Sequence, residues 1–124
     1  MSREHAMVRE LIAVHDGLRR ELKELRGAPE LTRDLRVRCA YYCHHVEMHH
    51  RVESHYLFTM LRARFPESAE VVDRLEREHA KVAEILSAIE QAADVRPELD
   101  RLAGELLAHL DYEEEQLAPL LSRL

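Results

Sequence analysis

The sequence predicts an all-α fold, an up-down-up-down antiparallel four-helix bundle with a metal site in its core. Three observations lead to this prediction. The 124-residue chain has only three glycines and four prolines. Its apolar residues recur with the 3.6-residue period of a helix, and histidines and glutamates interrupt these apolar stripes. A chain of this length forms one domain, residues 1–124, around a single core.

Prolines and glycines divide the chain into four segments that we expect to be helices. The breaks fall at Gly27 and Pro29, at Pro66 and at Pro97. In each case a proline precedes a glutamate, which is typical of a helix start. Short connections make consecutive helices antiparallel neighbours. The predicted helices span residues 4–26, 31–64, 67–93 and 97–122.

Composition argues against several functional classes. A formal net charge of −6 without a basic stripe is a poor match for nucleic acid or an anionic membrane. No stretch approaches the roughly 20 apolar residues that span a bilayer, and no signal peptide is visible. We therefore expect a cytoplasmic protein. Cys39 and Cys43 do not form a CxxC pair and are expected to be structural thiols.

The segment CHHVEMHHRVESHYLF, residues 43–58, contains five of the nine histidines. At about 100° per residue, Glu53, Tyr56 and His45 all fall within about 40° of His49 around a helix. We expect His49 and Glu53 to face inward, with His45 as a third member. Of the other three histidines in this segment, His50 lies on the flank, about 100° from His49. His44 and His55 lie more than about 120° from His49.

The other three predicted helices also place polar residues in their apolar stripes. His109 and Glu113 are four apart on the last helix, and the first and third each contribute one histidine. These groups lie at similar distances from the connecting turns, although the first connection must absorb an offset. Burying them without partners is costly, and a bound metal ion compensates. The candidate metal ligands are His15, His49, Glu53, His79, His109 and Glu113.

Imidazole and carboxylate ligands without thiolate favour iron or manganese over a structural zinc site. Glutamates that project from separate helices into a bundle core are typical of dinuclear carboxylate sites.

These residues resemble those of the hemerythrin-like, or HHE cation-binding, family. Four stretches resemble the motifs of its four helices in order: HDGLRREL (15–22), HHRVESHYLFTML (49–61), EREHAKV (76–82) and HLDYEEEQLAPLL (109–121). The resemblance implies a four-helix bundle that holds two iron ions with an oxo or hydroxo bridge. It also implies that the six candidates are the ligands, with Glu53 and Glu113 bridging the irons.

The sequence departs from the family pattern at three positions. The oxygen carriers of that family have a His-x3-His pair on the third helix, but here Leu75 stands four residues before His79. The carriers also have an aspartate five residues after the histidine of the last helix. Here the carboxylate is most naturally Glu113, four residues after His109, and Glu114 is the alternative. Ser54 stands where many members have a second acid after the bridging glutamate.

The number of ligands affects the expected chemistry. Four histidines, two bridging carboxylates and one bridging oxygen leave two open positions on two octahedral irons. Two open positions favour a sensor or a peroxide-active centre over a reversible oxygen carrier. Tyr56 is either an additional ligand or a hydrogen-bond partner of a ligand. His45 is a candidate for orienting a bridging carboxylate.

We therefore predict a non-heme diiron protein that binds or reacts with O₂, peroxide or nitric oxide. Its role would be sensing, redox signalling or detoxification, and peroxide consumption is the enzymatic form of this prediction. The alternative is iron storage or delivery, or an iron-responsive interaction module without redox turnover.

Overall fold

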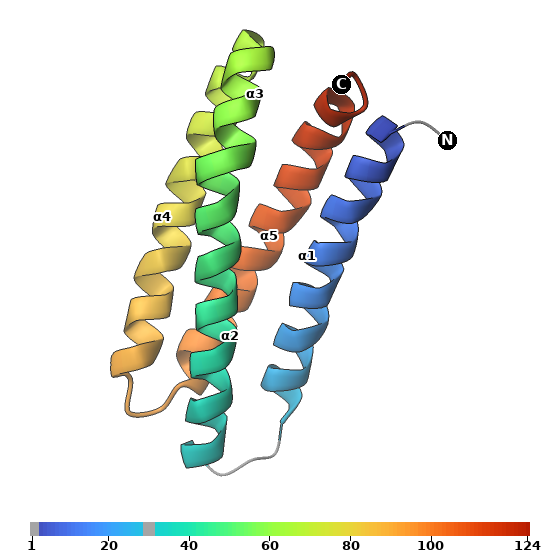
Figure 1. Ribbon diagram of the computed structural model, residues 1–124. Helices are drawn as coiled ribbons and strands as arrows, with labels where there is room; N and C mark the ends of the chain where they lie inside the picture. The colour runs from blue at the N-terminus through green and yellow to red at the C-terminus, as the bar shows by residue number, and fades with distance from the viewer. Residues whose placement is uncertain (1–2, 29–31) are drawn as a thin grey trace.

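The computed structural model describes residues 3–28 and 32–124. Within them the chain forms four long helical rods, and the predicted four-helix bundle is confirmed (Figure 1). The first rod is α1 (Arg3–Gly27), and the second combines α2 (Thr32–Val52), η1 (Glu53–Leu57) and α3 (Phe58–Arg64). A short 3₁₀ turn, η2 (Pro66–Ser68), leads into α4 (Ala69–Gln91), and the last rod is α5 (Arg96–Leu121).

The rods pack as a closed ring in which each helix contacts two neighbours. Contacts join α1 to α2, α2 to α4, α4 to α5 and α5 to α1. In Figure 1, α2 begins beyond the last turn of α1, as the predicted offset requires. No helix in the described residues is long and apolar enough to span a bilayer.

The core consists of two apolar clusters separated by a polar layer. The larger cluster includes Leu18, Val46 and Leu106, and lies toward the α1–α2 connection. The smaller lies toward the other end and includes Phe58 and Leu117. A buried hydrogen bond of 2.8 Å from the Tyr42 hydroxyl to the Leu18 carbonyl holds α2 against α1. Between the clusters, the bundle buries histidines and glutamates.

The second rod contains a π-helical turn, η1, that begins at Glu53. A π turn adds a residue to the helix and rotates everything after it by roughly 100° relative to an α-helix. Phe58 and Leu61 are consequently buried, whereas Tyr56 is 67% exposed. The inward orientation predicted for Tyr56 is therefore wrong, because the prediction assumed a regular helix. π turns often occur at functional sites.

Before the π turn, the buried face of α2 is not centred on His49, as the prediction assumed. Cys39, Tyr42 and Val46 are buried, and their mean direction lies about 50° to 80° from His49. His45 lies on the other side of His49, and its side chain is 50% exposed, 3.3 Å from Glu21. The inward orientation predicted for His45 is also wrong.

Candidate metal centre

The polar layer brings together all six candidate ligands. His15 comes from α1, His49 from the last turn of α2, Glu53 from η1 and His79 from α4. His109 and Glu113 come from α5, one helical turn apart. Five of the six residues are buried, and the His49 side chain is 13% exposed.

Each of the two glutamates presents its two oxygens to different histidines. Glu53 Oε2 lies 3.1 Å from His49 Nε2 and 3.5 Å from His15 Nε2, and Glu53 Oε1 lies 3.3 Å from His79 Nε2. Glu113 Oε1 lies 3.5 Å from His15 Nε2, and its Oε2 lies 3.4 Å from His109 Nε2. Both carboxylates thus span the layer between two groups of imidazoles.

His50 joins this cluster, although its position on the helix had placed it on the flank. Its ring is 6% exposed and stacks on the ring of His79 at 3.7 Å between centroids, with an interplanar angle of 6°. It also meets the His109 ring edge-on at 5.1 Å. The burial of Cys39, Tyr42 and Val46 explains this, because His50 lies on the same side of the helix. Their pattern was the sequence signal that could have identified it.

The donor atoms at the centre of the cluster have no hydrogen-bond partner. Among the described residues, the buried side-chain atoms without one include the Nε2 atoms of all five histidines and both oxygens of Glu53 and Glu113. Buried polar groups in proteins are almost always hydrogen-bonded, and orphaned ones are costly. All nine atoms are metal donors, and bound metal ions would satisfy them.

The atoms form two donor sets. Ligand atoms of His15, His49 and Glu53 lie within 4.8 Å of one another. The second set, also within 4.8 Å, contains His50, His79, His109 and Glu53. Glu53 belongs to both sets, and Glu113 contacts one histidine of each. The arrangement is suited to two metal ions that share two carboxylates.

Outer hydrogen bonds fix the orientation of three histidines. His15 Nδ1 lies 2.8 Å from Glu114 Oε2, and His109 Nδ1 lies 2.7 Å from Glu78 Oε1. His79 Nδ1 lies 3.2 Å from the Ser54 hydroxyl. When Nδ1 carries the proton, Nε2 is left as a lone pair that faces the centre.

Arginines extend two of these contacts to the surface. Arg19 lies 2.8 Å from Glu114, and Arg74 lies 3.0 Å from Glu78. The two relays, His15–Glu114–Arg19 and His109–Glu78–Arg74, serve different donor sets. Glu114, the predicted alternative to Glu113, thus faces the outer side of His15, whereas Glu113 faces the centre.

The electrostatics differ among the histidines of the cluster, since carboxylates outweigh burial and raise the pKa of His109 as well as that of His15. Burial lowers the pKa of His15, but the carboxylates of Glu113 and Glu53 outweigh it and raise the pKa to about 10. Burial together with the neighbouring His79 and His109 lowers the pKa of His50 to about 2. Burial raises the pKa of Glu53, but its contacts with Glu113 and the histidines outweigh this and lower it. A carboxylate and a neutral imidazole are the forms that bind metal.

Comparison with known families agrees with this geometry. Residues 3–121 match the family described as the hemerythrin HHE cation-binding domain. The chain belongs to this family. No curated protein and no solved structure matched the chain.

Membership in the HHE family identifies the ligand class as a metal cation. The buried histidines and glutamates of this HHE domain can hold one. Of the residues predicted from sequence, His15, His49, Glu53, His79, His109 and Glu113 meet in the polar layer. His45 and Tyr56 lie outside it, and His50 is the addition.

Proposed function

We propose that this HHE domain is a non-heme diiron protein that binds or reacts with O₂, nitric oxide or peroxide. One iron would be held by His15 and His49, and the other by His50, His79 and His109. Glu53 and Glu113 would bridge them. The observation that carries the proposal is the set of nine buried donor atoms without partners, divided into two groups that share carboxylates.

Iron fits this donor set better than the common alternatives. A site of imidazoles and carboxylates without thiolate suits iron. Cys39 and Cys43 do not supply a thiolate here, because both belong to the larger apolar cluster and not to the polar layer. Calcium and magnesium prefer oxygen ligands, whereas five of the seven side chains here are imidazoles.

The fifth histidine changes the number of open positions. With His50 as a ligand and one bridging oxo or hydroxo group, two octahedral irons keep one open position instead of the two inferred from sequence. That position would lie beside His15 and His49, the half with fewer histidines. A single open position favours the binding of one small ligand at a time.

The surroundings of His49 support a small, apolar ligand. A cleft of about 300 Å³ reaches His49 and Glu53 from the surface. Its walls are mainly apolar and come from α1 and the second rod, including Met7, Leu11, Val14 and Val52. O₂ and nitric oxide cross such a cleft without loss of hydrogen bonds to water, whereas peroxide gives up several.

When bound, the two irons supply reversible ligand binding and electron transfer. The protein's own residues set the conditions for that chemistry. Glu114 and Glu78 orient His15 and His109 through Nδ1. The apolar clusters close the two ends of the layer toward the ends of the bundle. Sensing, redox signalling and detoxification are the roles that this combination supports.

Iron content and the visible spectrum test the proposal. We expect about two irons per chain after anaerobic reconstitution, and the bands of an oxo-bridged diferric centre after oxidation. The reduced protein is then mixed separately with O₂, nitric oxide and peroxide, and the spectrum is followed. Failure to retain stoichiometric iron would contradict the proposal. Iron that reacts with none of the three would instead indicate iron storage or delivery, or an iron-responsive interaction module.

A further inference from the structure

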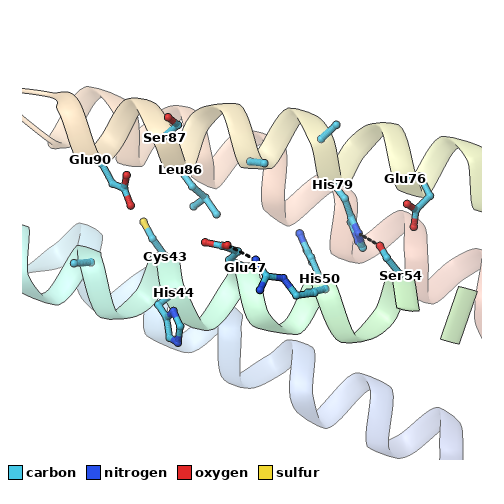
Figure 2. Close-up of a pocket in the computed structure, with 14 residues that line it drawn as sticks. Cys43, His44, Glu47, His50, Ser54, Glu76, His79, Leu86, Ser87 and Glu90 are labelled. Atoms are coloured by element: carbon cyan, nitrogen blue, oxygen red, sulfur yellow. Dashed lines mark hydrogen bonds and ion pairs between the residues drawn. The ribbon is translucent and has the colours of Figure 1, made fainter. Parts of the chain in front are cut away.

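A second opening reaches the cluster from the opposite side, and its chemistry differs from that of the apolar cleft. It is a groove of about 620 Å³ between α2 and α4. Three carboxylates line it, Glu47, Glu76 and Glu90, together with one cationic side chain, Arg51. In Figure 2, Glu90 and Cys43 lie toward one end of the groove, and Glu76 lies toward the other, near His79 and Ser54.

The groove ends on two histidines of the metal cluster. His50 and His79 line it and also belong to the three-histidine donor set. Both rings are more than nine-tenths buried, and neither Nε2 atom has a hydrogen-bond partner. His50 projects from α2 toward α4 (Figure 2). The groove is therefore continuous with the three-histidine donor set.

Glu76 supplies a second unpartnered donor, outside the cluster. Its Oε1 atom is buried and has no hydrogen-bond partner. Glu47, by contrast, is held by Arg51 at 2.8 Å. A carboxylate oxygen that is shielded from water and has no partner attracts a cation more strongly than an exposed or paired one. Glu76 is thus a candidate cation ligand at the same end of the groove as His79.

The apolar cleft is a poor path for a cation. Glu10 and Tyr56 are the polar side chains in its lining besides His49 and Glu53, and the other walls are apolar. A hydrated divalent ion in this cleft would lose most of its water shell with few donors to replace it. The carboxylates and imidazoles of the groove replace those waters one at a time, because oxygen and nitrogen donors occur along its length. Acidic clefts also concentrate cations and increase their rate of association.

We propose that the α2–α4 groove is the route by which ferrous iron enters the centre. Glu76 is the first inner ligand of the incoming ion, and His79, at the same end of the groove, and His50 then receive it into the three-histidine set. The inference rests on the proposed metal centre and adds to it a separate path for the metal, distinct from the apolar cleft. No electron transfer or bond cleavage is involved, since the ion only exchanges water for protein ligands.

The rate of iron uptake by the metal-free protein tests this route. Ferrous iron is mixed anaerobically with the protein, the reaction is quenched with a chelator at set times, and retained iron is counted. We expect Glu76→Gln to slow uptake about three- to tenfold without changing the final iron content. Glu70→Gln is the matched control, because it removes the same charge from an exposed position on α4 outside the groove.

Obstruction of each opening gives an independent test. Ala83→Trp places a bulky ring at an exposed position in the groove, and we expect it to slow uptake at least as much as Glu76→Gln. Val14→Trp narrows the apolar cleft and should leave uptake unchanged. Slower uptake in Val14→Trp with normal uptake in Ala83→Trp would overturn the proposal, as would equal rates in Glu76→Gln and Glu70→Gln. A wild-type protein that retains no iron would overturn the metal centre itself.

Discussion

The two halves of the metal cluster share their carboxylates but differ in their imidazoles. The half around His15 and His49 has two histidines and adjoins an apolar cleft. The half around His79 and His109 also contains His50, and adjoins the carboxylate-lined groove. The difference shows that the asymmetry of the centre depends on one residue, His50, which directly follows a ligand of the other half.

The pKa values set His50 apart from the other histidines of the cluster whose pKa is shifted. Two carboxylates raise the pKa of His15 to about 10, whereas burial among other imidazoles lowers that of His50 to about 2. His109, in the three-histidine half, resembles His15, because Glu113 and Glu78 outweigh the effect of burial and raise its pKa. Each half therefore contains a histidine whose pKa the carboxylates raise, and His50 differs from both.

The largest effect is expected from removal of a carboxylate that both halves share. Glu53→Ala deletes two of the nine central donor atoms, one from each half, so iron content should fall from about two per chain to nearly none. Elemental analysis after reconstitution measures this. Glu115→Ala, an exposed position on α5, should keep full iron content. Two retained irons in Glu53→Ala would show that this carboxylate does not bridge.

Replacement of His50 tests the asymmetry directly. His50→Leu fills the space beside His79 with an apolar side chain and removes the third imidazole of that half. We expect the second iron to bind at least about tenfold more weakly, and azide, titrated into the oxidised protein at saturating iron, to bind at about two positions instead of one. His44→Leu, on the exposed side of α2, is the control. One azide per centre in His50→Leu would mean that His50 is not a ligand.

Substitutions in the two relays should have smaller effects, each confined to the iron affinity of one half of the cluster. Glu78→Gln weakens the orientation of His109, and Glu114→Gln weakens that of His15. Each should lower the affinity for one iron by about tenfold and leave the other nearly unchanged. Competition with a chelator of known affinity separates the two steps, and Glu84→Gln on the exposed side of α4 serves as the reference. Equal weakening of both irons by both variants would argue against separate halves.

The smallest effect is expected at Tyr56. Its side chain is 67% exposed and lies outside both donor sets. Tyr56→Phe should therefore leave the visible spectrum of the oxidised protein unchanged. Loss of a phenolate-to-iron band in this variant would restore Tyr56 as a ligand.

The sequence was sufficient for the fold and for much of the site, because both depend on helical periodicity. His109 and Glu113 lie on a regular helix, so their four-residue spacing gave their common direction. The second rod is different, since the π turn at Glu53 rotates all later residues. The prediction assumed a regular helix with 100° per residue throughout this rod, and it therefore placed Tyr56 inward.

The choice of reference residue explains the other errors. His49 lies at the edge of the buried face of α2, and its side chain is 13% exposed. With His49 as the centre, His45 was predicted to face inward and His50 to lie on the flank, but His45 is half exposed and His50 is buried. The apolar residues Tyr42 and Val46 define the buried face better, because packing decides the orientation of a helix. The outer contacts of Glu78 and Glu114 join residues far apart in sequence, which no local pattern reveals.

A Mössbauer spectrum of the oxidised protein loaded with ⁵⁷Fe tests the central claim most directly. Two irons with different numbers of imidazole ligands should give two quadrupole doublets of equal area. The same spectrum of His50→Leu should show one doublet altered and the other retained. A single doublet in the wild-type protein, or a signal for only one iron per chain, would contradict a centre with two unequal halves.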